Sequence, residues 1–185
     1  MLYAQIHLTL PAWVHDEIEQ DRVYADAGSR IALAIDLSRR NVQHRTGGPF
    51  GAAVFSGDGR LLGVGVNRVV PTSCSAAHAE VLALASSQQR TQSYRLNAGG
   101  SRITLATSSQ PCSMCFGAIL WAGIDEVLIG ASAEDVQSLA GFDEGPLPAD
   151  WTGEMAKRGI AVQQGLMRDH ARDVLREYGA GGVVY

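Results

Sequence analysis

Two short stretches decide how this chain is built, His78-Ala79-Glu80 and Pro111-Cys112-Ser113-Met114-Cys115. They supply one imidazole, two thiolates and one carboxylate, and the carboxylate is too close to the histidine in sequence to be an expected fourth ligand. A structural zinc is closed by four protein ligands, whereas three leave a coordination position for water. The pattern therefore predicts a catalytic site for one Zn²⁺ per chain, with His78, Cys112 and Cys115 as ligands.

The spacing also assigns a role to Glu80. Zinc lowers the pKa of a bound water toward neutrality, so that a nucleophilic hydroxide exists at ordinary pH. A carboxylate beside that water can carry protons to and from the reacting group. We therefore expect Glu80 to act as general acid and base.

The order His-x-Glu followed by Pro-Cys-x-x-Cys is similar to that of the cytidine and deoxycytidylate deaminase superfamily. The resemblance extends from about residue 24 to about residue 178. It implies a three-layer α/β/α fold with a central mixed five-stranded sheet, and hydrolytic deamination of a small aminated nucleobase. It also implies pairing into a homodimer.

Apolar periodicity and turn residues predict an alternation of helices and strands, typical of an α/β domain. We expect helices over 13–20, 24–44, 76–87, 111–121, 133–139, 151–158 and 167–178, and strands over 50–55, 61–70, 102–107, 126–130 and 160–165. With the resemblance, this implies an arm with a short helix over residues 1–23, the deaminase domain over 24–178, and a tail over 179–185 that reaches toward the active site.

Composition limits the partners. The 185 residues are 46% hydrophobic, which suits one domain, and carry a net charge of −4 with scattered basic residues. A protein that neutralises several phosphates normally needs a basic patch, so we expect a small-molecule substrate and no nucleic acid.

No apolar run has membrane-spanning length, no targeting segment is visible, and only three cysteines are present. These features favour a cytoplasmic protein without a membrane partner.

The same resemblance implies three substrate contacts. Asn67 matches a position that hydrogen-bonds the substrate ring or sugar. Phe50, after Gly-Gly-Pro, matches a residue that packs against the base. The backbone of Ala79, between the metal ligand and the acid, contacts the base in such enzymes.

The stretch Gly141-Phe142-Asp143-Glu144-Gly145-Pro146 resembles a loop of a bacterial guanine deaminase branch, related to plant guanosine deaminases. This resemblance implies that Glu144 is a second proton-carrying acid and that Phe142 and Asp143 contact the substrate. It also implies that Tyr185, in the tail, reaches over the pocket. Guanine, converted to xanthine and ammonia, is the expected substrate.

Other interpretations remain open from the residues alone. Alternative substrates are guanosine, cytosine or an aminotriazine such as ammeline, and the adenosine of a tRNA; a zinc-stabilised binding module without turnover is a further alternative. Asp143 and Glu144 would then be solvated loop acids and Asn67 a turn residue. Phe50, Phe142 and Tyr185 would be packing residues. Cys74 is either a small buried hydrophobe or a fourth ligand.

Overall fold

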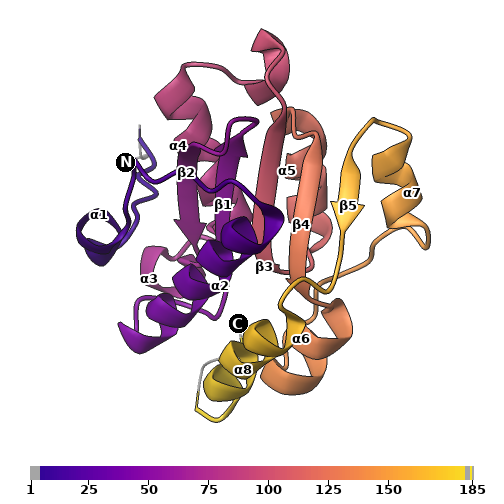
Figure 1. Cartoon of the computed structure of the whole chain (residues 1–185). Coiled ribbons are helices and arrows are strands. Elements are labelled where there is room, and N and C mark those ends of the chain that lie inside the picture. The colour runs from indigo at the N-terminus through magenta and orange to yellow at the C-terminus, as the bar shows by residue number, and fades with distance from the viewer. Residues whose placement is uncertain (1–4, 182–183, 185) are drawn as a thin grey trace.

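The computed structural model describes residues 5–181 and 184. Figure 1 shows strands in the centre of the molecule and helices around them. The strands are β1 (Gly51–Ser56), β2 (Leu61–Val66), β3 (Ile103–Ser109), β4 (Glu126–Ala131) and β5 (Ala161–Gln163). The helices are α1 (Trp13–Glu17), α2 (Ala27–Gln43), α3 (Val69–Thr72), α4 (Ala79–Thr91), α5 (Ser113–Ala122), α6 (Ala133–Ala140), α7 (Trp151–Ala156) and α8 (Arg168–Gly179), with a 3-10 turn, η1 (Leu96–Gly99).

The strands form one mixed sheet in the order β2-β1-β3-β4-β5. Strand β1 is antiparallel to both β2 and β3, whereas β3, β4 and β5 run parallel. Parallel neighbours need a crossover connection, and α5 supplies the one between β3 and β4. The predicted five-stranded mixed sheet is therefore confirmed.

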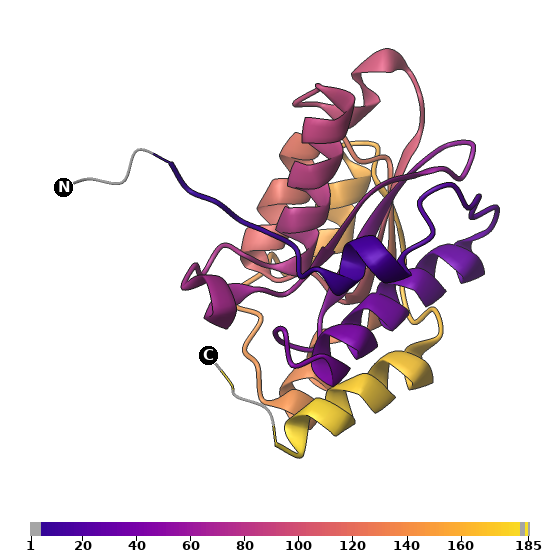
Figure 2. The ribbon, with the colours of Figure 1, turned by 90° about the vertical axis from the view of Figure 1, so that its left-hand side faces the viewer.

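Helices cover both faces of the sheet, as Figure 2 shows from one edge. Helices α2 and α8 contact one face, and α2 packs mainly on β1. Helices α4 and α5 cover the other face, with α4 packed mainly on β2. The molecule thus has the three layers that the sequence predicts.

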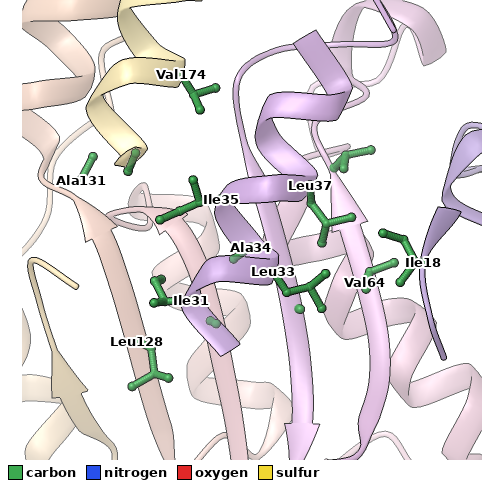
Figure 3. Close-up of a cluster of buried hydrophobic side chains, with 14 of the residues drawn as sticks. Ile18, Ile31, Leu33, Ala34, Ile35, Leu37, Val64, Leu128, Ala131 and Val174 are labelled. Carbon is green, nitrogen blue, oxygen red and sulfur yellow. The ribbon is translucent and has the colours of Figure 1, made fainter. Parts of the chain in front are cut away.

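The larger hydrophobic cluster lies between α2 and the sheet. Ile31 and Leu37, on one face of α2, are fully buried, because apolar residues at helical spacing form one apolar stripe. Figure 3 shows them in the same cluster as Leu128 and Val64 of the sheet and Val174 of α8. Each large side chain buried in this way contributes roughly 1.5–3 kcal/mol of hydrophobic free energy.

The N-terminal segment belongs to this cluster as well. Trp13 and Val14 of α1, together with Ile18, are buried against the domain. The short helix predicted over 13–20 is present but ends at Glu17. None of the helices within residues 5–181 has the length and apolarity needed to cross a membrane.

Some predicted boundaries were wrong. The strand expected over 61–70 ends at Val66, because the Arg68 N–H bonds to the Ala77 carbonyl and Val69–Thr72 turns into a helix. Pro71 is tolerated there since N–H groups in the first turn of a helix lack intrahelical partners. Strand β3 continues through Ser109, where a loop was expected.

Close contact between α4 and β2 depends on a glycine. A Cβ at Gly65 would lie 2.0 Å from the Ala79 carbonyl oxygen and 2.5 Å from the Ala83 nitrogen, both backbone atoms. Any side chain at this position must therefore push α4 away from the sheet. Since α4 begins next to His78, the metal ligand would move with the helix.

We expect Gly65→Ala to lower the free energy of unfolding by about 1–3 kcal/mol, the usual cost of overpacking. Chemical denaturation would measure the change. The matched control is Gly99→Ala, where an added Cβ meets no atom within 4 Å. Equal stability of the two variants would contradict the proposed packing constraint.

Candidate metal centre and substrate pocket

Three side chains meet where two helices begin. His78 is the N-cap residue of α4, Cys112 is the N-cap residue of α5, and Cys115 lies in the first turn of α5. The ligand atoms of the three residues all lie within 4.8 Å of one another. Both cysteines were expected within a helix from 111, but α5 begins at Ser113 and Cys112 precedes it.

The spacing of these atoms suits zinc. His78 Nδ1 lies 3.5 Å from Cys112 Sγ and 3.7 Å from Cys115 Sγ. Tetrahedral zinc with ordinary Zn–S and Zn–N bond lengths separates its ligand atoms by about 3.5–3.8 Å. One nitrogen and two sulfurs form a zinc-type donor set that leaves a fourth position for water.

The helix ends also favour thiolates. Unpaired N–H groups and the helix dipole stabilise negative charge at a helix N-terminus. The Cys115 N–H donates to Cys112 Sγ at 3.5 Å. The hydrogen bond from the Cys115 thiol, followed by that from His78, lowers the pKa of Cys112 to about 4. Cys112 is therefore a thiolate at neutral pH, ready to bind a cation.

Glu80 lies beside these ligands in the first turn of α4 and is only 7% exposed. Its Oε1 accepts a hydrogen bond from Thr107 Oγ1 at 3.1 Å, and its Oε2 lies 3.4 Å from Cys115 Sγ. Burial raises the pKa of the Glu80 carboxyl. A carboxyl group with a raised pKa can hold a proton and release it again at neutral pH.

A cavity of about 230 Å³ opens in front of this cluster. Its lining combines aromatic rings with several polar groups. It consists of Phe50, Asn67, Val69, Ser75, His78, Ala79, Glu80, Gln110, Phe142, Asp143 and Glu144. A concave site with apolar walls and a few convergent polar groups is typical of small-molecule binding.

The structure thus brings together most of the residues singled out from the sequence. Cys112 and Cys115 are buried, adjoining this wall through His78. Tyr185 lies outside the described residues. Sequence reasoning missed Val69, Ser75 and Gln110 as lining residues. Gln110 directly precedes Pro111, and that position next to the motif was the one signal that could have identified it.

The loop after α6 carries Glu144 into the cavity. The Ser113 N–H at the start of α5 donates to the Glu144 carbonyl at 3.1 Å, which holds the loop beside the metal ligands. Burial, and then the charges of Glu80 and Cys112, raise the pKa of Glu144 to about 8. A bound cation would oppose this rise. Glu144 is thus a second, half-buried carboxyl group beside the metal ligands, and its raised pKa suits it to exchange protons.

Aromatic packing fixes the same loop from its other side. Phe142 is 6% exposed and meets Phe50 edge to face, with ring centroids 5.2 Å apart. It also stacks on Tyr178 of α8 at 5.9 Å. These contacts join the loop of Glu144 to the start of β1, so both walls of the cavity share one aromatic support.

Comparison with known proteins agrees with this geometry. A buried carboxyl beside a three-ligand zinc-type site on a three-layer α/β/α fold defines a zinc-dependent hydrolytic deaminase. The chain belongs to the family of the cytidine and deoxycytidylate deaminase zinc-binding region, whose model matches residues 27–131. The predicted family, fold and zinc dependence are thereby confirmed.

The chain is similar over most of its length to proteins of known activity. A solved guanine deaminase from Nitrosomonas europaea is 42% identical and covers 97% of this chain and 99% of that chain, with a TM-score of 0.91. A guanine deaminase of Bacillus subtilis is 33% identical over 140 residues, 76% of this chain and 86% of that protein. A tRNA-specific adenosine deaminase of Buchnera aphidicola is 28% identical over 130 residues, 70% of this chain and 79% of that protein.

We expect His78→Ala, Cys112→Ala and Cys115→Ala each to lose most of the bound zinc, because two protein ligands hold zinc poorly. Elemental analysis of the purified proteins would measure the metal. Cys74→Ala is the matched control and should keep one zinc per chain, since the described metal cluster excludes this cysteine. A loss of zinc in the control would make Cys74 a fourth ligand.

Proposed function

We propose that this protein is a guanine deaminase, which converts guanine and water to xanthine and ammonia. The observation that carries the proposal is a second carboxyl group, that of half-buried Glu144, in the same cavity as Glu80 and Asn67. Guanine presents an amino group and an N1–H beside an O6 acceptor, so a carboxyl group and an amide suit its edge. The extensive similarity to guanine deaminases supports the choice of base.

The reaction requires proton transfer at three points. Water must lose one proton as it adds to C2 and its second proton as the C2 carbonyl forms, the adjacent ring nitrogen must gain one, and the amino group must gain one before it leaves as ammonia. Zinc held by His78, Cys112 and Cys115 would supply a water molecule whose pKa lies near neutrality. Glu80 accepts the proton of that water and passes it to the ring nitrogen, for which its buried carboxyl with a raised pKa is suited.

Glu144 completes the transfer to the leaving group. Its carboxyl lies in the same cavity, and burial raises its pKa, which suits it to hold a proton for the leaving group. It donates that proton to the departing amine and recovers one from Glu80, which takes up the second proton of the water oxygen as the C2 carbonyl forms. Two carboxyl groups, one from α4 and one from the loop after α6, thus divide the proton transfers between them.

The remaining lining residues hold the base. The side chain of Asn67 hydrogen-bonds the ring, the backbone of Ala79 contacts the base edge, and Phe50 and Phe142 form an apolar wall. Asp143 adds a polar contact from the loop. Two related structures, 45% and 43% identical to this chain, are complexes with 2,6-diaminopurine and 8-azaguanine, which supports a purine at this place.

Tyr185 is proposed to contact the bound base from the C-terminal tail, residues 179–185. The described part of the tail supports this role, because Val184 Cγ2 lies 3.4 Å from the place of a Cβ on Gly141, at the start of the substrate loop. Residues 24–178 would then form the deaminase domain, and residues 1–23 an arm packed on it.

Two further parts of the proposal concern the setting of the enzyme. A homodimer is supported by a groove between α4 and α5 that is flanked by Trp121 and Tyr94, which are 81% and 88% exposed. Large exposed aromatic side chains around a groove are typical of protein interfaces.

A cytoplasmic location is supported by the three free thiols, which suit a reducing compartment. A role in purine metabolism follows from the proposed substrate.

The proposed substrate is tested by ammonia release from guanine, guanosine, cytosine, ammeline and adenine under identical conditions. We expect release from guanine and none from guanosine. Release from guanosine or a pyrimidine would contradict the assigned substrate while keeping the zinc chemistry.

A tRNA substrate is disfavoured by the net charge of −4. Steeply salt-dependent binding of RNA would contradict this expectation.

We expect Glu80→Gln to keep its zinc and to lower kcat for guanine by roughly 10²–10⁴-fold, the usual contribution of a general acid and base. Steady-state kinetics with parallel metal analysis would measure both quantities. Turnover near that of the parent enzyme would exclude the role of Glu80.

Glu144→Gln should lower kcat by at least roughly 10²-fold while guanine still binds, because the amide keeps the shape of the side chain but cannot release a proton. Stopped-flow turnover and equilibrium binding would separate the two effects. Asp143→Asn, in the same loop, changes a proposed binding contact instead of a proton carrier, so it should raise KM and leave kcat within roughly twofold of the parent. An unchanged rate in Glu144→Gln would reduce Glu144 to a loop acid.

A further inference from the structure

A buried amide links the two loops that carry Phe50 and Asn67. Asn41, near the end of α2, is 0% exposed. Its Nδ2 donates to the Gly48 carbonyl at 2.8 Å and to the Asn67 carbonyl at 2.9 Å. Because both amide hydrogens are used in this way, Asn41 has no donor left for a ligand. Its function is to hold the two loops together.

Both loops end in pocket residues. The Phe50 N–H donates to the Gly48 carbonyl at 2.9 Å, and the Asn67 N–H donates to the Phe50 carbonyl at 3.1 Å. Gly47 lies so close to Asn67 that an added Cβ would be 1.8 Å from the Asn67 carbonyl oxygen. A shift of Asn41 would therefore move Phe50 and Asn67 together.

The N-terminal segment sets the direction of the hydrogen bonds around Asn41. Trp13 Nε1 donates to Thr46 Oγ1 at 3.0 Å, and an indole N–H can only donate. The single proton of the Thr46 hydroxyl is then directed to an acceptor, and Asn41 Oδ1 at 2.7 Å is closer than the Asn41 carbonyl at 3.4 Å. With its oxygen engaged by Thr46, the Asn41 amide must turn its nitrogen toward Asn67 and Gly48.

The helix that carries Trp13 is itself docked firmly. The Trp13 ring stacks on His44, with centroids 5.2 Å apart and an interplanar angle of 11°. Glu17, at the other end of α1, forms an ion pair with Arg40, and its Oε1 lies 3.1 Å from His44 Nε2. The N-terminal segment is therefore held on α2 and on the residue after it by contacts that are separate from the indole N–H bond.

The hydrogen bonds that begin at Trp13 end at Asn67, whose side chain lies in the pocket. The Val69 N–H donates to Asn67 Oδ1 at 3.3 Å, so the oxygen is turned toward the backbone of α3. Among the residues that the structure describes, no protein group accepts from Asn67 Nδ2, and Asn67 lines the cavity. Its backbone is fixed by Asn41 and its amide by Val69, which leaves the amino end for a ligand.

We propose that Trp13, Thr46 and Asn41 form a positioning relay that sets the orientation of Asn67 and Phe50 in the substrate pocket. The relay gives the N-terminal segment a role in substrate binding, although it touches no substrate. Its kinetic consequence rests on the proposed function, in which Asn67 and Phe50 hold guanine. Its structural consequence, the orientation of the Asn67 amide, does not depend on which base is bound.

Thr46→Val interrupts the relay by removing the hydroxyl group, and Thr46→Ser restores it. Trp13→Phe removes the indole N–H but keeps a ring over His44. We expect Thr46→Val and Trp13→Phe each to raise KM for guanine roughly fivefold, the loss of about one hydrogen bond, with kcat within roughly twofold of the parent. Thr46→Ser should behave like the parent enzyme. The double variant should be no worse than Thr46→Val, because both changes break one series of bonds.

Glu17→Gln is the matched control, since it weakens the ion pairs of α1 and leaves the relay intact. Nuclear magnetic resonance of the zinc-loaded protein gives a second readout that needs no substrate. The side-chain amide signals of Asn67 should shift in Thr46→Val and Trp13→Phe, and stay in place in Glu17→Gln and Thr46→Ser.

The outcomes separate the relay from the enzyme assignment. Guanine turnover by the parent with an unmoved Asn67 signal and an unchanged KM in Thr46→Val would overturn the relay alone. No turnover of guanine, together with a shifted Asn67 signal, would overturn the proposed substrate and support the relay. A rise in KM that also appears in Thr46→Ser would overturn the relay as well. So would increases in KM from Thr46→Val and Trp13→Phe that add fully in the double variant.

Discussion

The structure depends on the meeting of two helix N-termini around one cation. Helices α4 and α5 lie on the same face of the sheet, and their N-cap residues, His78 and Cys112, come within 3.5 Å of each other. Once both cysteines are deprotonated, two thiolates beside a buried carboxyl would carry an excess of negative charge. A divalent cation removes that excess, because two thiolates and a neutral imidazole form a formally neutral shell around it. Gly65 permits the arrangement, since a side chain there would displace the start of α4.

Burial around this centre makes carboxyl groups useful as proton carriers. Glu80 reaches the cavity from α4 and Glu144 from the loop after α6, and desolvation raises the pKa of both. The charge of Glu80 adds to the rise in the pKa of Glu144, so the pair favours states in which at least one proton is held. The hydrogen bonds of Thr107 to Glu80 and of Ser113 to the Glu144 backbone fix the position of each group. The ability of these carboxyl groups to carry protons near neutral pH thus depends on their burial as well as on the residue type.

The sequence predicts local features well and long-range ones poorly. The spacing of Cys112 and Cys115 and the proximity of His78 to Glu80 are visible in the chain, because zinc chemistry demands those residue types at short separations. The helical turn at Val69–Thr72 was missed, since Pro71 looked like a strand breaker and not a residue of a first helical turn. The role of Asn41 could not be read either, because its partner Asn67 is 26 positions away and carries no chemical signature. Residues that only position other residues are therefore recognised from their contacts in the structure, since the sequence carries no signal for them.

The central claim is that three protein ligands hold the zinc and leave one position to water. X-ray absorption spectroscopy at the zinc edge of the substrate-free protein tests it most directly. We expect two sulfur ligands at about 2.3 Å and two lighter ligands, one imidazole nitrogen and one water oxygen, at about 2.0–2.1 Å. A first shell with three sulfur atoms would bring in Cys74, close the site with protein ligands, and contradict a catalytic zinc.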